Sequence, residues 1–368
     1  MKNKRFLLIL VLLLPVQMII VRILSSFPQA IEDYYSNGIY PFVSKMMRYA
    51  FGWLTFSFGD IMYAVLIILM ARAIFLFIKS KARHWKAFLL RTLAIASVVY
   101  FSFHLLWGLN YYRLPLHQSL GIAHEYTTED LLALTQKLID KSNALHDQLA
   151  SNDSTAVEVL TKGSDGEYHA FAKADLFKST LNGYENIKRQ FPKLNYPPKS
   201  IKTSLLSYPL SIMGYSGYLN PITNEAQVNG LVPAHRWPVI SCHEQAHQLG
   251  FAKENEANFV AVLATLNNDD VYFKYSGSIF ALRYCLNDVY RRDEEKGLQL
   301  REQLRPGILE NYAQSRAFWD EMDNPLEPFF KYFYSGYLKA NNQPEGMKSY
   351  SYMVALLVNY NKDFPKSF

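Results

Sequence analysis

Three long apolar runs crowd into the first part of this 368-residue chain. They cover residues 6–24, 61–78 and 87–109, and each is long enough to cross the hydrocarbon core of a bilayer as a helix. Buried helices of a soluble protein rarely combine such length with basic flanks. The pattern therefore predicts three transmembrane helices, the first of them an uncleaved anchor rather than a signal peptide.

Basic residues predict the orientation of these spans. The connection between the second and third runs carries four of them, Lys79, Lys81, Arg83 and Lys86. By the positive-inside rule this loop is cytoplasmic, and the basic N-terminus, two spans earlier, falls on the same side. The chain after the third span is then outside. We divide the chain into a membrane domain, 1–109, and an extracytoplasmic domain, 110–368.

Aromatic residues between and after the spans have the character of a membrane interface. Residues 25–51 combine several tyrosines with charged side chains, which is typical of an interfacial connection. Trp107, Tyr111 and Tyr112, at the end of the third run, are interpreted as interface anchors of the same kind.

The pattern changes to that of a globular domain after residue 110. Helical spacing of leucines predicts a helix over 128–150, capped by Thr127 or Thr128. Further helices are expected over 168–190, from 254, over 271–292, from 294 past 319, and over 347–361. Short β-prone segments, 201–208, 212–219 and 226–229, predict a small sheet directly before residue 240. The predicted fold is a three-helix membrane anchor followed by a helix-dominated α+β domain.

One motif in this domain carries chemistry. His243-Glu244-Gln245-Ala246-His247 is an HExxH sequence within a predicted helix over 240–249. Residues four apart share a helix face, so the two imidazoles can hold one divalent ion. Glu244 lies beside them, where its carboxylate can reach a water on that ion. The alternative is two ordinary helix histidines next to a surface glutamate.

A hydrolytic zinc site needs a third protein ligand. Gly250 can end the helix in a left-handed conformation and turn the chain back, and two acids follow, Glu254 and Glu256. We choose Glu254 because Asn258 shares its helix face and could support His247 or the Glu254 carboxylate. Glu256 points to another side of the helix and is kept as the alternative.

These residues resemble a known group of enzymes. HExxH followed by Glu254-xx-Ala257-Asn258 is similar to the gluzincin-type zincins, in which the first glutamate of such an element is the third zinc ligand. The separation is short here, and Asn258 stands where many of those families have aspartate. Lys253 occupies the place of the third histidine of metzincins, which excludes that group. With three spans, the whole chain resembles a bacterial family of membrane-anchored zinc peptidases of unestablished function.

The resemblance implies a zincin-like domain that uses Zn²⁺ to hydrolyse peptide bonds. Glu244 would take a proton from the attacking water and later give it to the leaving amine. A further group must stabilise the developing oxyanion. Four candidates remain open for this role: His235, Tyr275, Arg283 and Tyr284. The segment Tyr215–Asn220 is expected either to pair with an extended substrate as an edge strand or to form an ordinary hairpin.

Charge and cysteine content narrow the range of partners and crosslinks to expect. The net charge of +6 comes largely from clusters beside the apolar runs, so membrane topology explains it better than nucleic-acid binding. Only two cysteines occur, Cys242 and Cys285, which excludes a disulfide framework; they are expected to be buried thiols, with one bridge as the alternative.

The function expected from the sequence is a zinc peptidase of the bacterial cytoplasmic membrane that acts on its outer, periplasmic side. Its partners would be the lipid bilayer and a protein, peptide or cell-wall peptide substrate. Because His243 lies far beyond the third span in the sequence, cleavage inside the bilayer is not expected. A non-catalytic zinc-binding receptor or scaffold is the alternative, although a structural zinc site has no need of Glu244. A transporter component is not favoured.

Overall fold

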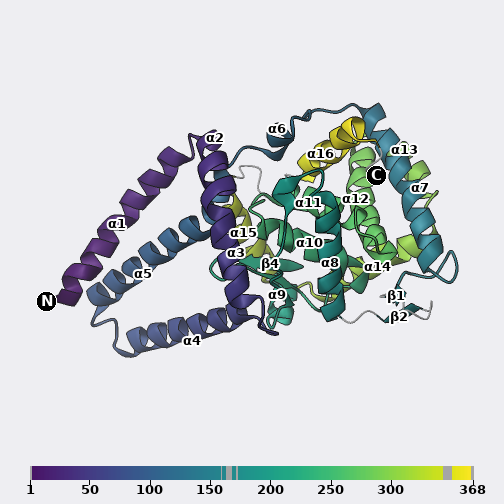
Figure 1. The fold of residues 1–368 in the computed structure, drawn as a ribbon. Helices are drawn as coiled ribbons and strands as arrows, with labels where there is room; N and C mark the ends of the chain where they lie inside the picture. Colours follow the sequence, from purple (N-terminus) through teal and green to yellow (C-terminus); the bar gives the residue numbers. More distant parts are fainter. Residues whose placement is uncertain (1, 159, 163–167, 171–172, 343–349, 366–368) are drawn as a thin grey trace.

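The computed structural model describes residues 2–158, 160–162, 168–170, 173–342 and 350–365, and helices dominate it (Figure 1). The N-terminal elements are α1 (Lys2–Leu24), α2 (Pro28–Ala30), the π-helix η1 (Ile31–Ile39), α3 (Tyr40–Phe51), α4 (Phe58–Lys79), α5 (Trp85–Leu106) and η2 (Gly108–Tyr112). The middle elements are α6 (Leu116–Leu120), α7 (Thr128–Leu149), β1 (Leu160–Lys162), β2 (Tyr168–Ala170), α8 (Lys173–Ile187), η3 (Pro192–Leu194), β3 (Ile201–Thr203), α9 (Ser207–Ile212), β4 (Gly217–Asn220) and β5 (Glu225–Val228). The C-terminal elements are η4 (Ala234–Arg236), α10 (Trp237–Gln248), α11 (Glu254–Leu266), α12 (Val271–Arg292), α13 (Glu294–Arg301), α14 (Pro306–Glu321), α15 (Glu327–Ala340) and α16 (Tyr350–Asp363).

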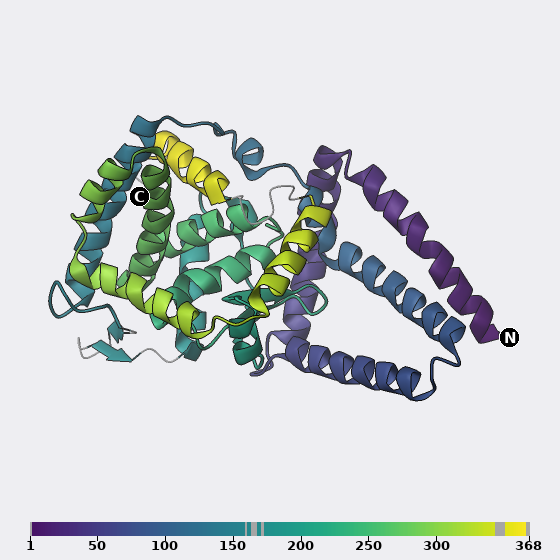
Figure 2. The same cartoon turned by 180° about the vertical axis from the view of Figure 1, so that it is seen from behind.

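Three helices, α1, α4 and α5, are long and apolar enough to cross a membrane, as predicted. They project from one side of the molecule (Figures 1 and 2). Their outer surfaces expose many aliphatic side chains. The third predicted run, 87–109, extends past the helix, because α5 ends at Leu106 and the chain turns into η2. Three such helices are compatible with a multi-pass membrane protein.

The segment predicted as an interfacial connection is helical. The consecutive elements α2, η1 and α3 cross the ends of the long helices on the side of the remaining domain (Figure 1). One face of α3 is buried through Tyr40, Ser44 and Arg48, while Phe42 and Tyr49 on the other face are exposed. A helix with one aromatic, exposed face at this position suits the membrane–water interface.

The N-terminal part and the domain after residue 110 interlock. Glu225 of β5 accepts hydrogen bonds from the backbone N–H groups of Phe58 and Gly59, at 3.1 and 2.6 Å, where α4 begins. The ammonium group of Lys202, on β3, donates to the carbonyl of Phe51 at 2.8 Å and forms a buried ion pair with Glu225. These contacts hold the small sheet directly against the start of a membrane helix.

Helices make up most of the core. The helix predicted from Thr127 is α7, and Thr127 and Asp130 form its capping box through reciprocal side-chain-to-backbone hydrogen bonds. Leu131, Leu134 and Leu138 are fully buried, and the helix packs against α12, which has the bounds that the sequence predicts. The helix predicted from residue 168 is wrong at its start, since Tyr168–Ala170 pairs with β1 and α8 begins at Lys173. The glycine-rich loop signal at 163–166 lies outside the described residues.

The predicted small sheet exists, but its strands are shorter. Its order is β3–β5–β4, with β3 parallel and β4 antiparallel to β5, which leaves β4 at the edge. The strand predicted over 201–208 stops early because Ser204 and Leu205 donate hydrogen bonds to the carboxylate of Asp60 on α4. The strand predicted over 212–219 is wrong in its first half, which contains the end of α9 and a left-handed turn at Gly214 (φ +81°).

Two differences concern the C-terminal part. The single helix predicted from residue 294 past 319 is broken into α13 and α14 before Pro306, which lacks the N–H needed to continue a helix. Helix α15 was not predicted at all, since its aromatic residues and Gly336 are weak helix formers. The last helix was predicted over 347–361; α16 confirms it from Tyr350, and residues 347–349 lie outside the described part.

Candidate metal centre

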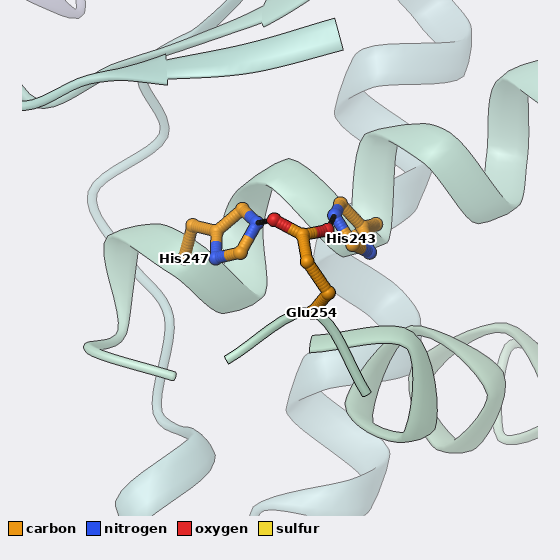
Figure 3. A group of neighbouring side chains, drawn as sticks. All are labelled: His243, His247 and Glu254. Atoms are coloured by element: carbon orange, nitrogen blue, oxygen red, sulfur yellow. Dashed lines mark ion pairs between the residues drawn. The ribbon is translucent and has the colours of Figure 1, made fainter. Parts of the chain in front are cut away.

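Helix α10 brings the two motif histidines onto one face. It runs from Trp237 to Gln248, and the ring centroids of His243 and His247 lie 4.6 Å apart (Figure 3). Nearly all other residues of α10 are buried in the domain core, so the helix has little freedom to move. The spacing of the motif and the burial of its helix therefore define one half of a ligand set.

A left-handed turn supplies the other half. Gly250 has φ +91°, and a Cβ there would lie 3.0 Å from both the Asn110 side chain and the ring of Tyr40. The turn reverses the chain so that α11 begins at Glu254, whose carboxylate lies between the two imidazoles (Figure 3). Glu256 lies elsewhere: it is buried and accepts a hydrogen bond from the backbone N–H of Leu116 at 2.9 Å.

The distances among these three side chains fit a metal ion. Nε2 of His243 lies 3.3 Å from one Glu254 oxygen, and Nε2 of His247 lies 3.7 Å from the other. All three ligand atoms lie within 4.8 Å of one another. Tetrahedral zinc with ligands at about 2.1 Å needs ligand–ligand separations of roughly 3.4 Å. The three ligand atoms therefore lie close enough together to contact a single metal ion.

The hydrogen bonding of His247 supports the same reading. Its Nδ1 lies 2.7 Å from the carbonyl of Phe251, which can only accept, so Nδ1 carries the proton. The lone pair of Nε2 then faces the Glu254 carboxylate. Two electron-pair donors that point at one another favour a cation between them, and a carbonyl that orients a histidine in this way is typical of metal sites.

The ionisation of the group is consistent with metal binding. Burial lowers the pKa of His243, but the hydrogen bond to Glu254 and the two glutamate charges outweigh burial and raise it. Burial and His243 lower the pKa of His247 to about 4, so this imidazole is neutral near pH 7. Burial raises the pKa of Glu254, but His243, His247 and Tyr334 reverse this and lower it to about 2. An anionic carboxylate and a neutral imidazole are the forms that bind metals, so Glu254 and His247 are in the binding form, while a metal would have to displace the proton that Glu254 stabilises on His243.

Glu244 lies in the same cavity and has a different environment. It is buried, and its Oε2 atom has no hydrogen-bond partner among the described residues. Burial raises the pKa of Glu244, the charge of His243 lowers it and the charge of Glu254 raises it; the result is a pKa of about 8. A carboxylate that titrates near neutral pH is suited to accept and release a proton.

Tyr334 is a site residue that the sequence analysis missed. Its hydroxyl donates a hydrogen bond to Oε1 of Glu254 at 2.7 Å. It belongs to α15, far from the motif in sequence, in a chain with 26 tyrosines. No local pattern singles it out; only the packing of α15 against the site does.

Residues predicted as membrane-interface anchors instead support the site. Trp107 and Tyr111 are buried, and Tyr112 nearly so. The indole of Trp107 donates to the main-chain carbonyl of His247 at 3.0 Å, and Tyr40 donates to that of Gln248 at 2.9 Å. These carbonyls lie at the end of α10, where no N–H of a following helical turn is available; that of His247 also accepts from the N–H of Gly250, and that of Gln248 from the hydroxyl of Ser44. The anchor interpretation was wrong because the three residues are buried: Trp107 bonds to the end of α10, and the hydroxyl of Tyr111 donates to that of Tyr337.

Asn258 is part of the site. It is buried and lines the cavity that contains the motif. Its amide is among the groups that raise the pKa of His243, and the predicted support of His247 or Glu254 by Asn258 stays a prediction.

Of the four candidates for an oxyanion-stabilising group, the structure places one in the cavity that contains the motif and three elsewhere. Tyr284 lines the cavity that contains the motif. Tyr275 is buried and donates to Asn311, while His235 and Arg283 line a separate small depression. Arg236 and Tyr215, which the sequence analysis did not consider for this role, line the cavity as well.

The cavity has a volume of about 900 Å³, and many parts of the chain line it. Helix α10 contributes the motif, and the segment through β4 runs along one side. Helix α15 and, unexpectedly, the ends of α4 and α5 contribute as well. Gly217 on β4 comes so close to Glu244 that a Cβ there would lie 2.6 Å from its Oε1.

The two cysteines take no part in the site. Cys242 and Cys285 are both free and fully buried. Burial raises the pKa of both thiols, which makes them unreactive small core residues.

Comparison with known proteins gives a family but no activity. No curated protein and no solved structure matches the chain. The chain does match the family described as "protein of unknown function (DUF3810)" over residues 35–358, a range that starts in η1 and includes the whole His243–His247–Glu254 cluster. The protein therefore belongs to the DUF3810 family.

Proposed function

We propose that this protein is a membrane-anchored zinc peptidase of the zincin type. The observation that carries the proposal is the convergence of His243, His247 and Glu254 at ligand distances, with the carboxylate of Glu244 in the same cavity. A structural zinc site has no use for a buried, unpartnered carboxylate beside its ligands. The cavity also leaves room for a substrate, as a catalytic zinc site requires.

The chemistry follows from the arrangement of these side chains. Zinc held by the three ligands would supply a Lewis acid that makes water acidic and polarises a peptide carbonyl. Glu244 accepts the proton from the attacking water and returns it to the leaving amine. Tyr334 holds the Glu254 carboxylate, and Phe251 holds His247. Tyr284, Tyr215 and Arg236 are the cavity residues available to stabilise the oxyanion.

Strand β4 is the proposed binding edge for the substrate backbone. It lies at the edge of the sheet, and the residues from Tyr215 to Leu219 line the cavity beside Glu244. An extended peptide could add to this edge as a further antiparallel strand. The absence of a side chain at Gly217 then matters, because it lets the edge lie directly against the carboxylate.

We propose that the site acts outside the cytoplasmic membrane of a bacterium. The basic loop between α4 and α5 favours the cytoplasmic side, and the domain lies at the opposite ends of both helices (Figure 1). The substrate class is then a protein, a peptide or the peptide part of cell-wall material in the periplasm. Nucleic acid is not a proposed partner.

Metal analysis with three variants tests the proposal. The full-length protein in detergent is expected to contain about one zinc per chain, and Glu244→Gln is expected to keep zinc and lose peptide hydrolysis. Glu254→Ala should lose the metal, whereas Glu256→Ala should keep it. Wild-type protein that binds no zinc would overturn the proposal. Zinc without hydrolysis in the wild type would favour a non-catalytic receptor or scaffold.

A further inference from the structure

The cavity of the metal centre extends between two membrane helices. Its walls include Met62, Tyr63 and Leu66 of α4, and Val98, Val99, Ser102 and Phe103 of α5, together with His243, His247 and Glu254. In sequence the motif lies far from both helices. In space, one continuous cavity joins them.

The depth of this extension follows from helix geometry. Leu66 lies eight residues inside α4 from Phe58, and Val98 lies eight residues inside α5 from Leu106. At 1.5 Å per residue, both correspond to about 12 Å along the helix. The hydrocarbon core of a bilayer is about 30 Å thick, so this part of the cavity reaches the depth of acyl chains.

The two helices diverge toward the domain. Phe77 near the end of α4 and Phe88 near the start of α5 stack at 4.3 Å, which joins the helices at the basic loop. Toward the domain they separate, and α1 packs along α5 rather than between α4 and α5 (Figures 1 and 2). The part of the cavity that α4 and α5 line, at the ends of these helices near the candidate metal centre, is called the wedge below.

The chemistry of the wedge is that of lipid. The seven residues from α4 and α5 that line it carry no charge, whereas the charged lining residues of the cavity come from α10, α11, η4 and α15. Because the wedge is uncharged and lies at the depth of acyl chains, it favours a hydrocarbon ligand over a hydrated peptide. The polar end, with the metal ligands, is where a peptide bond would lie.

Helix α15 forms a wall between the cavity and the surroundings. Tyr334, Tyr337 and Leu338 face the cavity, and the ring of Tyr337 contacts Phe103 of α5 with centroids 6.1 Å apart. Tyr332 and Phe333, on another face, are 79% and 65% exposed. Exposed aromatic side chains next to membrane helices suit the headgroup region. This arrangement places the metal centre at the level of the membrane surface.

We infer that the site receives its substrate laterally from the membrane, and that the substrate is a peptide joined to an acyl chain. The acyl chain occupies the wedge between α4 and α5, and the peptide bond next to the anchor reaches the metal centre. The inference rests on the proposed peptidase function. The uncharged lining of the wedge, at the depth of acyl chains, supports a hydrocarbon chain as its occupant.

Lipid access can be tested without any activity. Ser102→Cys, labelled with a fluorophore, is reconstituted in phosphatidylcholine vesicles that contain lipid with a spin-labelled acyl chain. The native cysteines are buried and do not compete for the label. Ile95→Cys, on the exposed surface of α5, is the lipid-facing reference, and Glu295→Cys on α13 is the water-facing one. Quenching at Ser102 is expected to reach at least half of that at Ile95; quenching as low as at Glu295 would overturn the inference.

Substrate selection is tested with a fluorogenic peptide library in three forms: free, with two acyl chains, and fused to a transmembrane helix. Anchoring alone concentrates a peptide at the vesicle surface and raises its cleavage rate. The quantity compared between variants is therefore the ratio of the cleavage rates of the acylated and free peptides. Leu66→Trp, which fills the wedge, should lower the ratio of acylated to free cleavage at least tenfold. Ile68→Trp, on the exposed face of α4 outside the cavity, is the matched control and should leave the ratio unchanged.

The outcomes separate this inference from the proposed function. An unchanged ratio in Leu66→Trp, or cleavage of the transmembrane form in preference to the acylated one, would overturn the inference and leave the peptidase intact. If zinc-loaded wild type cleaves none of the three forms, the peptidase proposal fails. The quenching at Ser102 then still decides whether lipid enters the wedge.

Discussion

The indole Nε1 of Trp107 donates a hydrogen bond to the main-chain carbonyl of His247 over 3.0 Å. Trp107 directly follows the last residue of α5, the third apolar helix, and its ring meets the His247 imidazole edge to face with centroids 6.0 Å apart. One residue thus joins a membrane helix to the proposed metal helix. The positions of α5 and α10 therefore cannot change independently.

Trp107→Phe keeps an aromatic ring and removes this donor. The His247 carbonyl keeps the N–H of Gly250 as a partner at 3.0 Å, so the change removes one buried hydrogen bond, worth about 0.5–1.5 kcal/mol, and we expect a modestly lower midpoint of thermal unfolding in detergent. Zinc affinity, measured by competition with a chelator, should fall about tenfold because His247 is less well oriented. Trp53→Phe is the matched control: Trp53 is 75% exposed, and its indole also donates to a backbone carbonyl. Equal effects of the two changes would contradict the assignment.

Tyr334→Phe tests the support of the third ligand. The change removes only the hydroxyl that donates to Glu254. Loss of a group that orients a metal ligand lowers affinity about 10- to 100-fold, and we expect this in a zinc titration with little change in unfolding temperature. Tyr332→Phe, on the exposed face of the same helix, should behave like the wild type. Unchanged zinc affinity in Tyr334→Phe would show that the hydroxyl does not orient Glu254.

Gly217→Ala separates the proton-transfer group from the metal ligands. Its Cβ would lie 2.6 Å from Oε1 of Glu244 and 2.7 Å from the carbonyl of Gln227, so the carboxylate or the strand must move. We expect peptide hydrolysis to fall at least tenfold while zinc content stays unchanged, since small displacements of a catalytic group are costly. Gly336→Ala has open space around the added methyl group and serves as the control. Loss of zinc in Gly217→Ala would instead indicate a general distortion of the site.

The buried Glu32–Arg113 pair predicts a dependence of stability on pH. Burial by itself raises the pKa of Glu32, but the hydrogen bonds and charge of Arg113 outweigh it and lower the pKa from 4.5 to about 2. The folded state therefore favours the ionised form. Its stabilisation, about 3 kcal/mol, is complete above pH 4.5 and is lost as the pH falls toward 2.

Wild type and Glu32→Gln are compared by unfolding between about pH 7 and 3.5. The free-energy difference between them should be largest near neutral pH and should narrow below pH 4.5. Glu295→Gln, an exposed position on α13, should show a small and constant difference. A difference for Glu32→Gln that widens on acidification would contradict the assignment.

Much of the metal centre could be predicted from local sequence. The HExxH spacing places His243 and His247 on one helix face, and a glycine after the helix permits the left-handed turn that returns the chain. Glu254, as the first residue of the next helix, then comes within reach. These steps involve neighbouring residues only, and the structure brings the three side chains together.

The groups around the centre could not be predicted in this way. Tyr334, Trp107 and Tyr40 come from three segments that lie far from the motif and far from one another in the chain. By sequence alone, any of the many tyrosines could have donated such a hydrogen bond. The end of the motif helix and Glu254 offer acceptor oxygens in the interior, and only packing decides which side chains donate to them.

The sequence by itself determined the three apolar helices, the motif helix, the turn and the first acid after it, because each depends on residue type and short-range spacing. The tertiary structure decided where the site lies relative to the three apolar helices. Separation along the chain argued for a site remote from the spans, but α4, α5 and His243 border one cavity. Hydrogen bonds from Trp107 to His247, and from the start of α4 to Glu225, are long-range contacts that no periodicity encodes, and they hold the centre against the membrane helices.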